Sequence, residues 1–330
     1  MKFGSPLTKY FRRFSILSFF FSLFVFSGCS AEKNCLSLGP TSTTTDKVAF
    51  TPYKVKASDS TCLQAYEWKP LTTPIHGAVV IIHGVRDHAT RYNALAESLN
   101  TMGCIVYAQD HRGHGYSGGD RQRFESIPQL VEDVRLAVME AKKRNPNVPV
   151  FLFGHSLGGL TAATYAVIHQ DEISGVVLSG ALLKLPPFVN GFQTGAARFF
   201  GFLIPGLHIQ AIDDQDFVRD SSAKAEIAHD PLIDHDNLPA RSAAAGLNGL
   251  DEIQQRMEEI TLPLLILHGK ADKSTNNEGS KELYARAKST DKTLHLYDNA
   301  QHDLMHEPEH NQVIQDITTW VASHLPKVSQ

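Results

Sequence analysis

Ser156 lies in the sequence Gly154-His155-Ser156-Leu157-Gly158, directly after the apolar run 150–153 and before a stretch with helical character. A serine held in a sharp turn between a strand and a helix is exposed as a nucleophile. The flanking glycines suit this turn, since side chains there would collide with the neighbouring strand and helix. A helix that starts behind Ser156 also favours negative charge that develops nearby. The motif therefore predicts acyl transfer by a nucleophilic serine.

A nucleophilic serine needs a base to remove its proton, and that base needs an acid to orient it. In proteins with this serine turn, the chain order is serine, acid, histidine. Asp272 follows the apolar run 262–267, and His302 is the first histidine after the strand-like run 293–297. We therefore expect Asp272 to orient His302, and His302 to act as the base for Ser156. His306 is the alternative base.

The negative charge of a tetrahedral intermediate needs two backbone N–H donors, which form an oxyanion hole. The residue after the nucleophile, Leu157, is expected to supply one. The loop that follows His83-Gly84 is expected to supply the other, from the amide of Val85. We expect His83 to stabilise this loop and assign it no chemical role.

Two strand-like segments precede a regular alternation of strands and helices. The expected strands are 48–56, 62–68, 77–83, 104–109, 150–153, 173–178, 262–267 and 293–297, and the expected helices are 92–102, 127–144, 156–169, 278–287 and 313–324. Strands separated by helices predict an α/β fold with a mostly parallel, doubly wound sheet. Ligands of such sheets bind at the carboxyl ends of the strands, which is where the three expected site residues follow their strands.

Residues 181–245 interrupt this alternation. They contain Pro186-Pro187, then apolar residues at roughly helical spacing, then a polar stretch as far as Pro239. We expect this segment to be an inserted helical cap over the sheet edge that carries the site. Three of its side chains are expected to line an acyl-chain site, namely Phe188, Phe192 and Phe199. The alternative is an ordinary packed helical pair, because a helical aromatic stripe usually faces a core.

Residues 1–29 have the character of a targeting signal. Basic residues precede an apolar run over 15–26, which is shorter than the roughly 20 residues of a membrane-spanning helix. The run ends at Val25-Phe26-Ser27-Gly28-Cys29, which resembles the bacterial lipobox, although Phe26 stands where an aliphatic residue is usual. In a lipobox the cysteine is lipidated and becomes the new N-terminus. Residues 30–46 are then expected to be a polar tether before a domain over 47–330.

The lipobox resemblance implies that lipid on Cys29 holds the protein at a membrane surface. Ser30 directly after the cysteine implies the outer membrane of a Gram-negative bacterium. The sequence therefore predicts an exported, membrane-anchored lipoprotein. The alternatives are an uncleaved signal anchor and an ordinary secretory signal.

Cysteine usage adds little. If Cys29 is lipidated, three cysteines remain, and an odd number cannot all pair. A disulfide between Cys35 and Cys62 is compatible with export, but the spacing does not itself indicate one. Cys104 lies in an apolar run and is expected to be a buried hydrophobic residue.

Composition excludes several classes of function. The chain has 330 residues, of which 42% are hydrophobic and 20% are charged, as is typical of a globular protein. The net charge of −4 argues against a nucleic-acid partner, which needs a basic surface patch. No pattern indicates a cofactor or a metal site. Asp110, His111 and His114 are types that bind metals, but their glycine-rich loop favours a structural turn.

Four segments resemble the monoacylglycerol lipase and lysophospholipase group of α/β-hydrolases. They are IHGVRDHATRY over 82–92, DHRGHGYS over 110–117, GHSLGG over 154–159 and ADK over 271–273. The resemblance runs from about residue 48 to 325 and implies the α/β-hydrolase fold with its inserted helical cap. It also implies that Asp87 and Arg91 lie near the head-group end of the site, although Asp87 stands where glutamate is more usual. The alternative for these two residues is an ion pair that braces their loop.

The residues and the resemblance together predict a serine ester hydrolase. Its substrates are expected to be monoacylglycerols or lysophospholipids, cleaved through an acyl-enzyme intermediate. The alternatives with the same triad are a short-chain carboxylesterase, a thioesterase and an aminopeptidase. The alternative from a different class is a non-catalytic lipid-binding lipoprotein, which has no need of all three triad groups. The expected partners are a lipid substrate and, through Cys29, a membrane surface.

Overall fold

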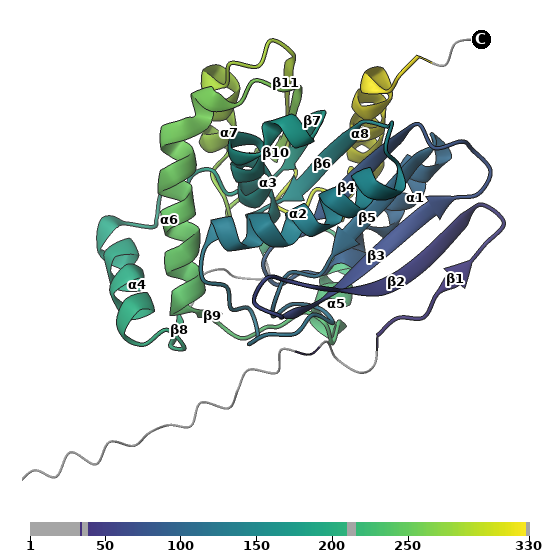
Figure 1. Cartoon of the computed structure of the whole chain (residues 1–330). Helices are drawn as coiled ribbons and strands as arrows, with labels where there is room; N and C mark the ends of the chain where they lie inside the picture. Colours follow the sequence, from purple (N-terminus) through teal and green to yellow (C-terminus); the bar gives the residue numbers. More distant parts are fainter. Residues whose placement is uncertain (1–33, 35–38, 210–215, 328–330) are drawn as a thin grey trace, which may run out of the picture. The chain divides into compact units, whose positions relative to one another are not determined.

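A mostly parallel sheet forms the centre of the computed structural model, which describes Asn34, residues 39–209 and residues 216–327 (Figure 1). Within these residues the sheet has nine strands in the order β1-β2-β3-β5-β4-β6-β7-β10-β11. The strands are β1 (Thr43–Thr44), β2 (Val48–Lys56), β3 (Cys62–Pro70), β4 (Gly77–Ile82), β5 (Cys104–Gln109), β6 (Val150–His155), β7 (Gly175–Ser179), β10 (Leu264–Gly269) and β11 (Lys292–Tyr297). The strands from β5 to β11 pair in parallel, whereas β1, β2 and β3 pair antiparallel. The predicted sheet is confirmed.

Helices cover both faces of the sheet (Figure 1). The helices of the body are α1 (Asn93–Thr101), α2 (Ile127–Arg144), α3 (Leu157–Ile168), α6 (Ala240–Arg256), α7 (Asn277–Arg286) and α8 (His310–His324). Alternate residues of β4 explain the layering, because successive side chains of a strand point to opposite faces. Val80 and Ile82 pack in the core under α2, α3, α6 and α7, whereas Val79 and Ile81 pack in the core under α1 and α8.

Local signals in the sequence set the ends of α2. The side chain of Ser126 caps the helix by accepting a hydrogen bond from the amide of Gln129. Pro128 lies in the first turn, where its missing N–H has no helical partner. The helix ends at Arg144, directly before Asn145-Pro146. This helix carries one wall of the larger core and so fixes the strand that precedes Ser156.

The segment between β7 and α6 forms the cap. It contains α4 (Gly191–Leu203), β8 (His208–Ile209), α5 (Ser221–His229) and β9 (Leu238–Pro239), and β8 pairs with β9. Helix α4 packs closely on α6 because Gly201 has no side chain. A Cβ there would lie 2.7 Å from the carbonyl oxygen of Ala240. The expected insertion ended near residue 245, but α6 begins at Ala240 and packs on α2 and α3, so its first turns belong to both regions.

The N-terminal expectations fall largely outside the described residues, including the targeting signal, Cys29 and Cys35. Thr43 and Thr44 pair with β2, so sheet pairing begins inside the stretch expected to be a tether. Cys62 is disulfide-bonded. Cys104 is a buried free thiol whose pKa burial raises to about 12. Among the residues that the structure describes, no helix is both long and apolar enough to cross a membrane.

Candidate active site

Ser156 lies at a strained turn between β6 and α3. Its backbone has a φ of 55° and a ψ of −116°, a conformation that residues other than glycine rarely adopt. The flanking glycines are required by close packing. A Cβ at Gly154 would lie 2.4 Å from the carbonyl oxygen of Gly158, and one at Gly158 would lie 2.1 Å from that of Ile82. The sequence therefore forces Ser156 into a sharp, buried turn at the carboxyl end of β6.

The structure brings Ser156, His302 and Asp272 into one hydrogen-bonded line. The hydroxyl of Ser156 lies 2.9 Å from Nε2 of His302, and Nδ1 of His302 donates to Oδ2 of Asp272 at 2.8 Å. All three residues come from loops or turns at the carboxyl ends of strands β6, β10 and β11. This geometry allows His302 to remove the proton of Ser156 while Asp272 holds the imidazole.

The charges around the triad of Ser156, His302 and Asp272 favour a basic His302. Burial disfavours a charge on His302, but Asp272 outweighs burial and raises the pKa of the imidazole. Burial also disfavours a charge on Asp272, but His302 and His268 outweigh it and hold the pKa of the carboxyl below its ordinary value. Asp272 thus stays ionised beside a histidine that can take up a proton.

Several partners of Asp272 were not evident from the sequence. Oδ1 of Asp272 accepts hydrogen bonds from the amides of Ser274 and Thr275, at 2.7 and 2.9 Å. Oδ2 accepts from the hydroxyl of Thr275 at 2.8 Å and lies 3.1 Å from Nε2 of His268. His268 lies near the end of β10, four residues before Asp272. The turn between the two residues brings their side chains together. These contacts fix the carboxylate that faces His302.

His306, the alternative base, pairs with Asp303. Its Nδ1 donates to Oδ2 of Asp303 at 2.8 Å. Burial disfavours a charge on His306, but Asp303 outweighs it and raises the pKa of the imidazole. His306 therefore belongs to an ion pair beside the site, and His302 is the histidine that contacts the serine.

The two expected oxyanion donors lie beside Ser156. Val85 and Leu157 line the same cavity as the serine. Gly84 allows the loop of Val85 to approach, since a Cβ there would lie 3.1 Å from Cβ of Ser156. Within the described part of the chain, neither amide N–H donates to another residue. Both amides are thus free to bind an oxyanion.

An apolar cavity of about 440 Å³ opens from Ser156 toward the cap. Its walls come from the body and from the cap, and they include Phe124, Leu182, Leu185, Phe188, Ala197, Leu238, Leu247 and Leu250. This volume falls in the range of about 300 to 1,000 Å³ that is usual for small-molecule pockets. The cavity can hold an extended hydrocarbon chain with its reacting end at Ser156.

Phe188 lines this cavity, but the expectation that Phe192 and Phe199 also line it is wrong. These two side chains are 86% and 58% exposed. They lie seven residues apart on α4, which places them on one helix face. The cavity is lined from another face of α4, by Gln193, Thr194 and Ala197. The sequence pattern identified an apolar helix but not the direction in which its aromatic face points.

A second, much smaller pocket of about 20 Å³ also borders Ser156. It is lined by Val85, Arg86, Asp87, Arg91, His155, Ser156, Phe217, Ile227, His302 and Asp303. Such a volume has room for about one water-sized group. Burial and the neighbouring His302 lower the pKa of His155 to about 4, so its imidazole is neutral near pH 7. Ser156 therefore lines both a large apolar cavity and a small pocket with mostly polar lining residues.

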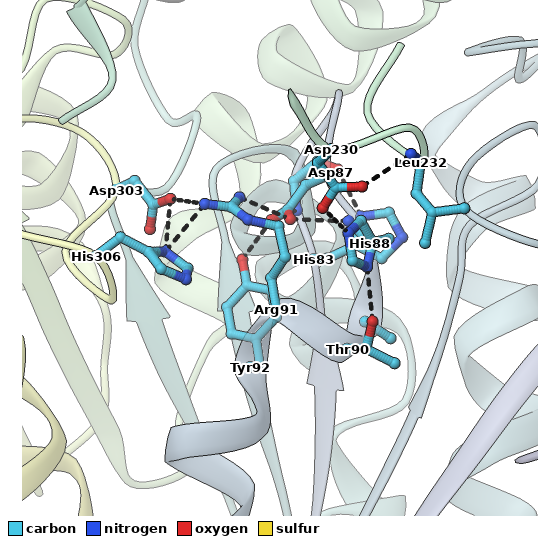
Figure 2. Close-up of polar contacts among 12 residues, drawn as sticks. His83, Asp87, His88, Thr90, Arg91, Tyr92, Asp230, Leu232, Asp303 and His306 are labelled. Atoms are coloured by element: carbon cyan, nitrogen blue, oxygen red, sulfur yellow. Dashed lines mark hydrogen bonds and ion pairs between the residues drawn. The ribbon is translucent and has the colours of Figure 1, made fainter. Parts of the chain in front are cut away.

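Asp87 and Arg91 line the small pocket and also brace its loop (Figure 2). Asp87 accepts hydrogen bonds from Nη1 of Arg91 at 2.9 Å and from the hydroxyl of Tyr92 at 2.7 Å. Nη2 of Arg91 continues to Oδ2 of Asp303 at 2.9 Å. The geometry thus contains the loop-bracing ion pair, at the polar end of the site where the resemblance places the two residues. Sequence reasoning missed Asp303, which lies in a different loop.

The cap is anchored to the loop that carries Val85 and to the loop that carries His302. His88 donates from Nε2 to Oδ2 of Asp230 at 2.8 Å, as Figure 2 shows. The carbonyl of Phe217 accepts from the amides of His302 and Asp303, at 3.0 and 2.9 Å. Because these are long-range contacts of backbone atoms and single side chains, no sequence pattern signalled them.

The loop considered for a metal is a structural turn. Asp110 accepts hydrogen bonds from the hydroxyl of Tyr66 and from the amides of Ala89 and Tyr116, at 2.8 to 2.9 Å. The amide of His111 donates to Nε2 of His83 at 2.9 Å, which ties this turn to the oxyanion loop. Across residues 39–209 and 216–327, no cluster of three or more His, Cys, Asp or Glu side chains is arranged for a metal ion.

A doubly wound sheet with a strained serine after β6, an acid after β10 and a histidine after β11 defines an α/β-hydrolase of the serine class. Residues 73–309 match the family described as serine aminopeptidase, S33 (Hydrolase_4), and the chain belongs to this family. It is a serine hydrolase.

Relatives of named function are similar to this chain over most of its length. A monoacylglycerol lipase from Mycolicibacterium smegmatis is 36% identical, over 78% of this chain and 92% of the relative. The human monoglyceride lipase is 34% identical, over 82% of this chain and 90% of the relative. The crystal structure of a monoacylglycerol lipase from Paleococcus ferrophilus has a TM-score of 0.73 at 33% identity, and covers 79% of this chain and 99% of that structure.

Proposed function

We propose that this protein hydrolyses monoacylglycerols to a fatty acid and glycerol. The observation that carries the proposal is that Ser156 lines two unlike pockets. The apolar cavity suits the acyl chain, and the small polar pocket suits a hydroxyl of the leaving alcohol. The similarity to monoacylglycerol lipases supports the same substrate.

The first half-reaction uses the line of Ser156, His302 and Asp272. Oγ of Ser156 attacks the ester carbonyl carbon while Nε2 of His302 takes its proton. The carbonyl oxygen becomes an oxyanion that accepts hydrogen bonds from the amides of Val85 and Leu157. The bond to glycerol then breaks, and His302 returns the proton to the departing alkoxide oxygen. The acyl group remains esterified to Ser156.

The second half-reaction releases the acyl group. His302 removes a proton from water, and the resulting hydroxide attacks the acyl-enzyme carbonyl. The oxyanion again lies at the amides of Val85 and Leu157. Collapse breaks the bond to Oγ of Ser156, which regains the proton from His302, and the fatty acid leaves. Asp272 stabilises the imidazolium in both halves without taking up the proton.

Lysophospholipids share the acyl chain but carry a phosphate on the head group. A pocket of about 20 Å³ favours a single hydroxyl over a phosphate diester. We therefore place monoacylglycerol ahead of lysophospholipid as the substrate. Short-chain esters and short-chain thioesters are expected to react more slowly, because their acyl groups leave the apolar cavity unfilled.

We further propose that the protein is an exported lipoprotein that works at a membrane surface. The lipobox-like sequence that ends at Cys29 supports lipidation. The disulfide at Cys62 supports an oxidising compartment. The cap supports a lipid surface as the source of substrate, since large apolar side chains on and after α4 are exposed: Phe192, Phe199, Phe202, Leu203 and Ile204.

The proposal is tested by incubating the purified protein with monoacylglycerol, lysophosphatidylcholine and a soluble acetyl ester. Release of fatty acid from monoacylglycerol at the highest kcat/KM supports it. A Ser156→Ala variant is the control and is expected to lose the activity. Labelling of Ser156 by a fluorophosphonate separates an enzyme from a lipid-binding protein on the same scaffold, which would remain unlabelled.

A further inference from the structure

Arg86 and Gln122 are both held in the left-handed backbone conformation, each with a φ of 55°. Residues other than glycine avoid this conformation because their Cβ crowds the following carbonyl oxygen. Both side chains nevertheless reach the same atom of the cap. The carbonyl oxygen of Asp236 accepts from Nη2 of Arg86 at 2.7 Å and from Nε2 of Gln122 at 3.0 Å. Strained residues that converge on one acceptor point to a feature maintained for function.

The shared carbonyl oxygen of Asp236 connects two parts of the candidate site. Arg86 directly follows Val85, the expected oxyanion donor, and Val85 lines both pockets. Leu238, two residues after Asp236, lines the acyl cavity. Arg86 also donates to the carbonyl oxygen of His235 at 3.3 Å. The cap backbone at 235–236 is therefore tied both to the oxyanion loop and to the wall of the acyl cavity.

We propose that Arg86 is a positioning residue. Its hydrogen bonds to the cap backbone at 235–236 hold the neighbouring amide of Val85 in the oxyanion hole. The inference rests on the proposed serine-hydrolase function. Hydrogen bonds from the charged guanidinium to two carbonyls offset the backbone cost of the left-handed conformation. Without them the backbone of residue 86 relaxes to an ordinary φ, and the neighbouring amide of Val85 turns away from the oxyanion. Gln122 steadies the same acceptor from the β5–α2 loop.

Two substitutions at one position separate the backbone from the side chain. Arg86→Met removes the hydrogen bonds and keeps the cost of a left-handed residue. Arg86→Gly also removes the bonds, but glycine adopts this φ without a steric penalty. We expect Arg86→Met to lower kcat for a soluble acetyl ester about tenfold, or about 1.4 kcal/mol in the barrier, with little change in KM. Arg86→Gly is expected to recover at least roughly threefold of that loss.

Arg121→Met is the matched control. Arg121 also reaches the cap, at the carbonyl of Leu232 and the carboxylate of Asp234, but its backbone is not left-handed. Its loss is expected to leave kcat unchanged. A control that falls as far as Arg86→Met contradicts the proposal, because general loosening of the cap then explains the effect.

The same full-length variants are labelled with a fluorophosphonate, whose rate of reaction with Ser156 depends on the oxyanion hole. Slower labelling of Arg86→Met, with recovery in Arg86→Gly, supports the proposal. Equal labelling of the wild type and Arg86→Met overturns it, whereas an unlabelled wild type overturns the proposed function and this inference with it. If Arg86→Met does not fold, Gln122→Met is expected to lower kcat about threefold, and a wild-type kcat in that variant contradicts the proposal.

Discussion

The guanidinium of Arg91 lies 2.9 Å from the carboxylate of Asp303, and this ion pair joins the oxyanion loop to the loop of His302. Arg91 also pairs with Asp87, at 2.9 Å, so one cation serves two buried carboxylates. Burial disfavours a charge on either carboxylate. At Asp303 the effects of His306 and Arg91 outweigh burial, and at Asp87 the effect of Arg91 does. The pKa of each carboxyl is therefore lowered. The side chain of Arg91 thus helps to fix the position of the oxyanion loop relative to the loop of His302.

Arg91→Met is expected to destabilise the protein strongly. It leaves Asp87 and Asp303 buried without their shared cation, a change that typically costs about 3 to 5 kcal/mol. The free energy of unfolding in urea measures the effect. Arg256→Met is the control, because its ion pairs with Glu252 and Glu259 lie at the partly exposed surface and a surface substitution typically changes stability by about 0.5 kcal/mol or less. Equal stabilities of the two variants contradict the bracing role.

The rate of ester hydrolysis is expected to fall as the pH is lowered through the pKa of His302. Only the neutral imidazole can accept the proton of Ser156, and Asp272 raises this pKa above the ordinary value of 6.5. The acidic limb of kcat/KM for a soluble ester should therefore lie above pH 6.5. Asp272→Asn removes the charge that raises the pKa and should move the limb to lower pH, with a rate loss of roughly 10⁴ by analogy with other triads. An acidic limb that does not move in Asp272→Asn argues against this assignment.

The line of Ser156, His302 and Asp272 could be predicted because each residue follows a recognisable strand in a fixed chain order. The mostly parallel sheet could be predicted for the same reason, since its apolar runs are long and regular. The direction of α4 could not, because helical periodicity shows that Phe192 and Phe199 share a face but not what that face meets. The bridge from Arg91 to Asp303 joins loops that are far apart in the chain, so only the folded structure brings them together.

Exposed cap side chains are expected to matter only for substrate presented in a membrane. Phe192 and Phe202 are 86% and 80% exposed, and they contribute apolar area that a lipid surface can cover. The double variant Phe192→Ser and Phe202→Ser should hydrolyse monoacylglycerol in phospholipid vesicles more slowly, by roughly tenfold, while turnover of a soluble ester stays the same. Met139→Ser, which changes an exposed side chain on α2, is the control. A loss on both substrates shows that the cap has another role.

Gly246 offers a way to shorten the acyl cavity. It lines the cavity on α6, and a Cβ there meets no atom within 4 Å. Gly246→Leu should fill this space, lower kcat/KM for long-chain monoacylglycerols at least tenfold, and spare short-chain esters. Gly195→Leu is matched, because Gly195 on α4 also has open space but does not line the cavity. A chain-length series measures both variants, and an unchanged profile in Gly246→Leu means that the acyl chain lies elsewhere.

The most direct test of the proposed hydrolysis follows the acyl group itself. The purified protein is mixed with a monoacylglycerol, quenched at early times and analysed by intact and peptide mass spectrometry, while released fatty acid and glycerol are quantified. We expect equimolar fatty acid and glycerol, a transient acyl ester on Ser156, and neither product nor adduct in Ser156→Ala. Undiminished hydrolysis in Ser156→Ala, or no hydrolysis of monoacylglycerol by the wild type, would contradict the proposed function.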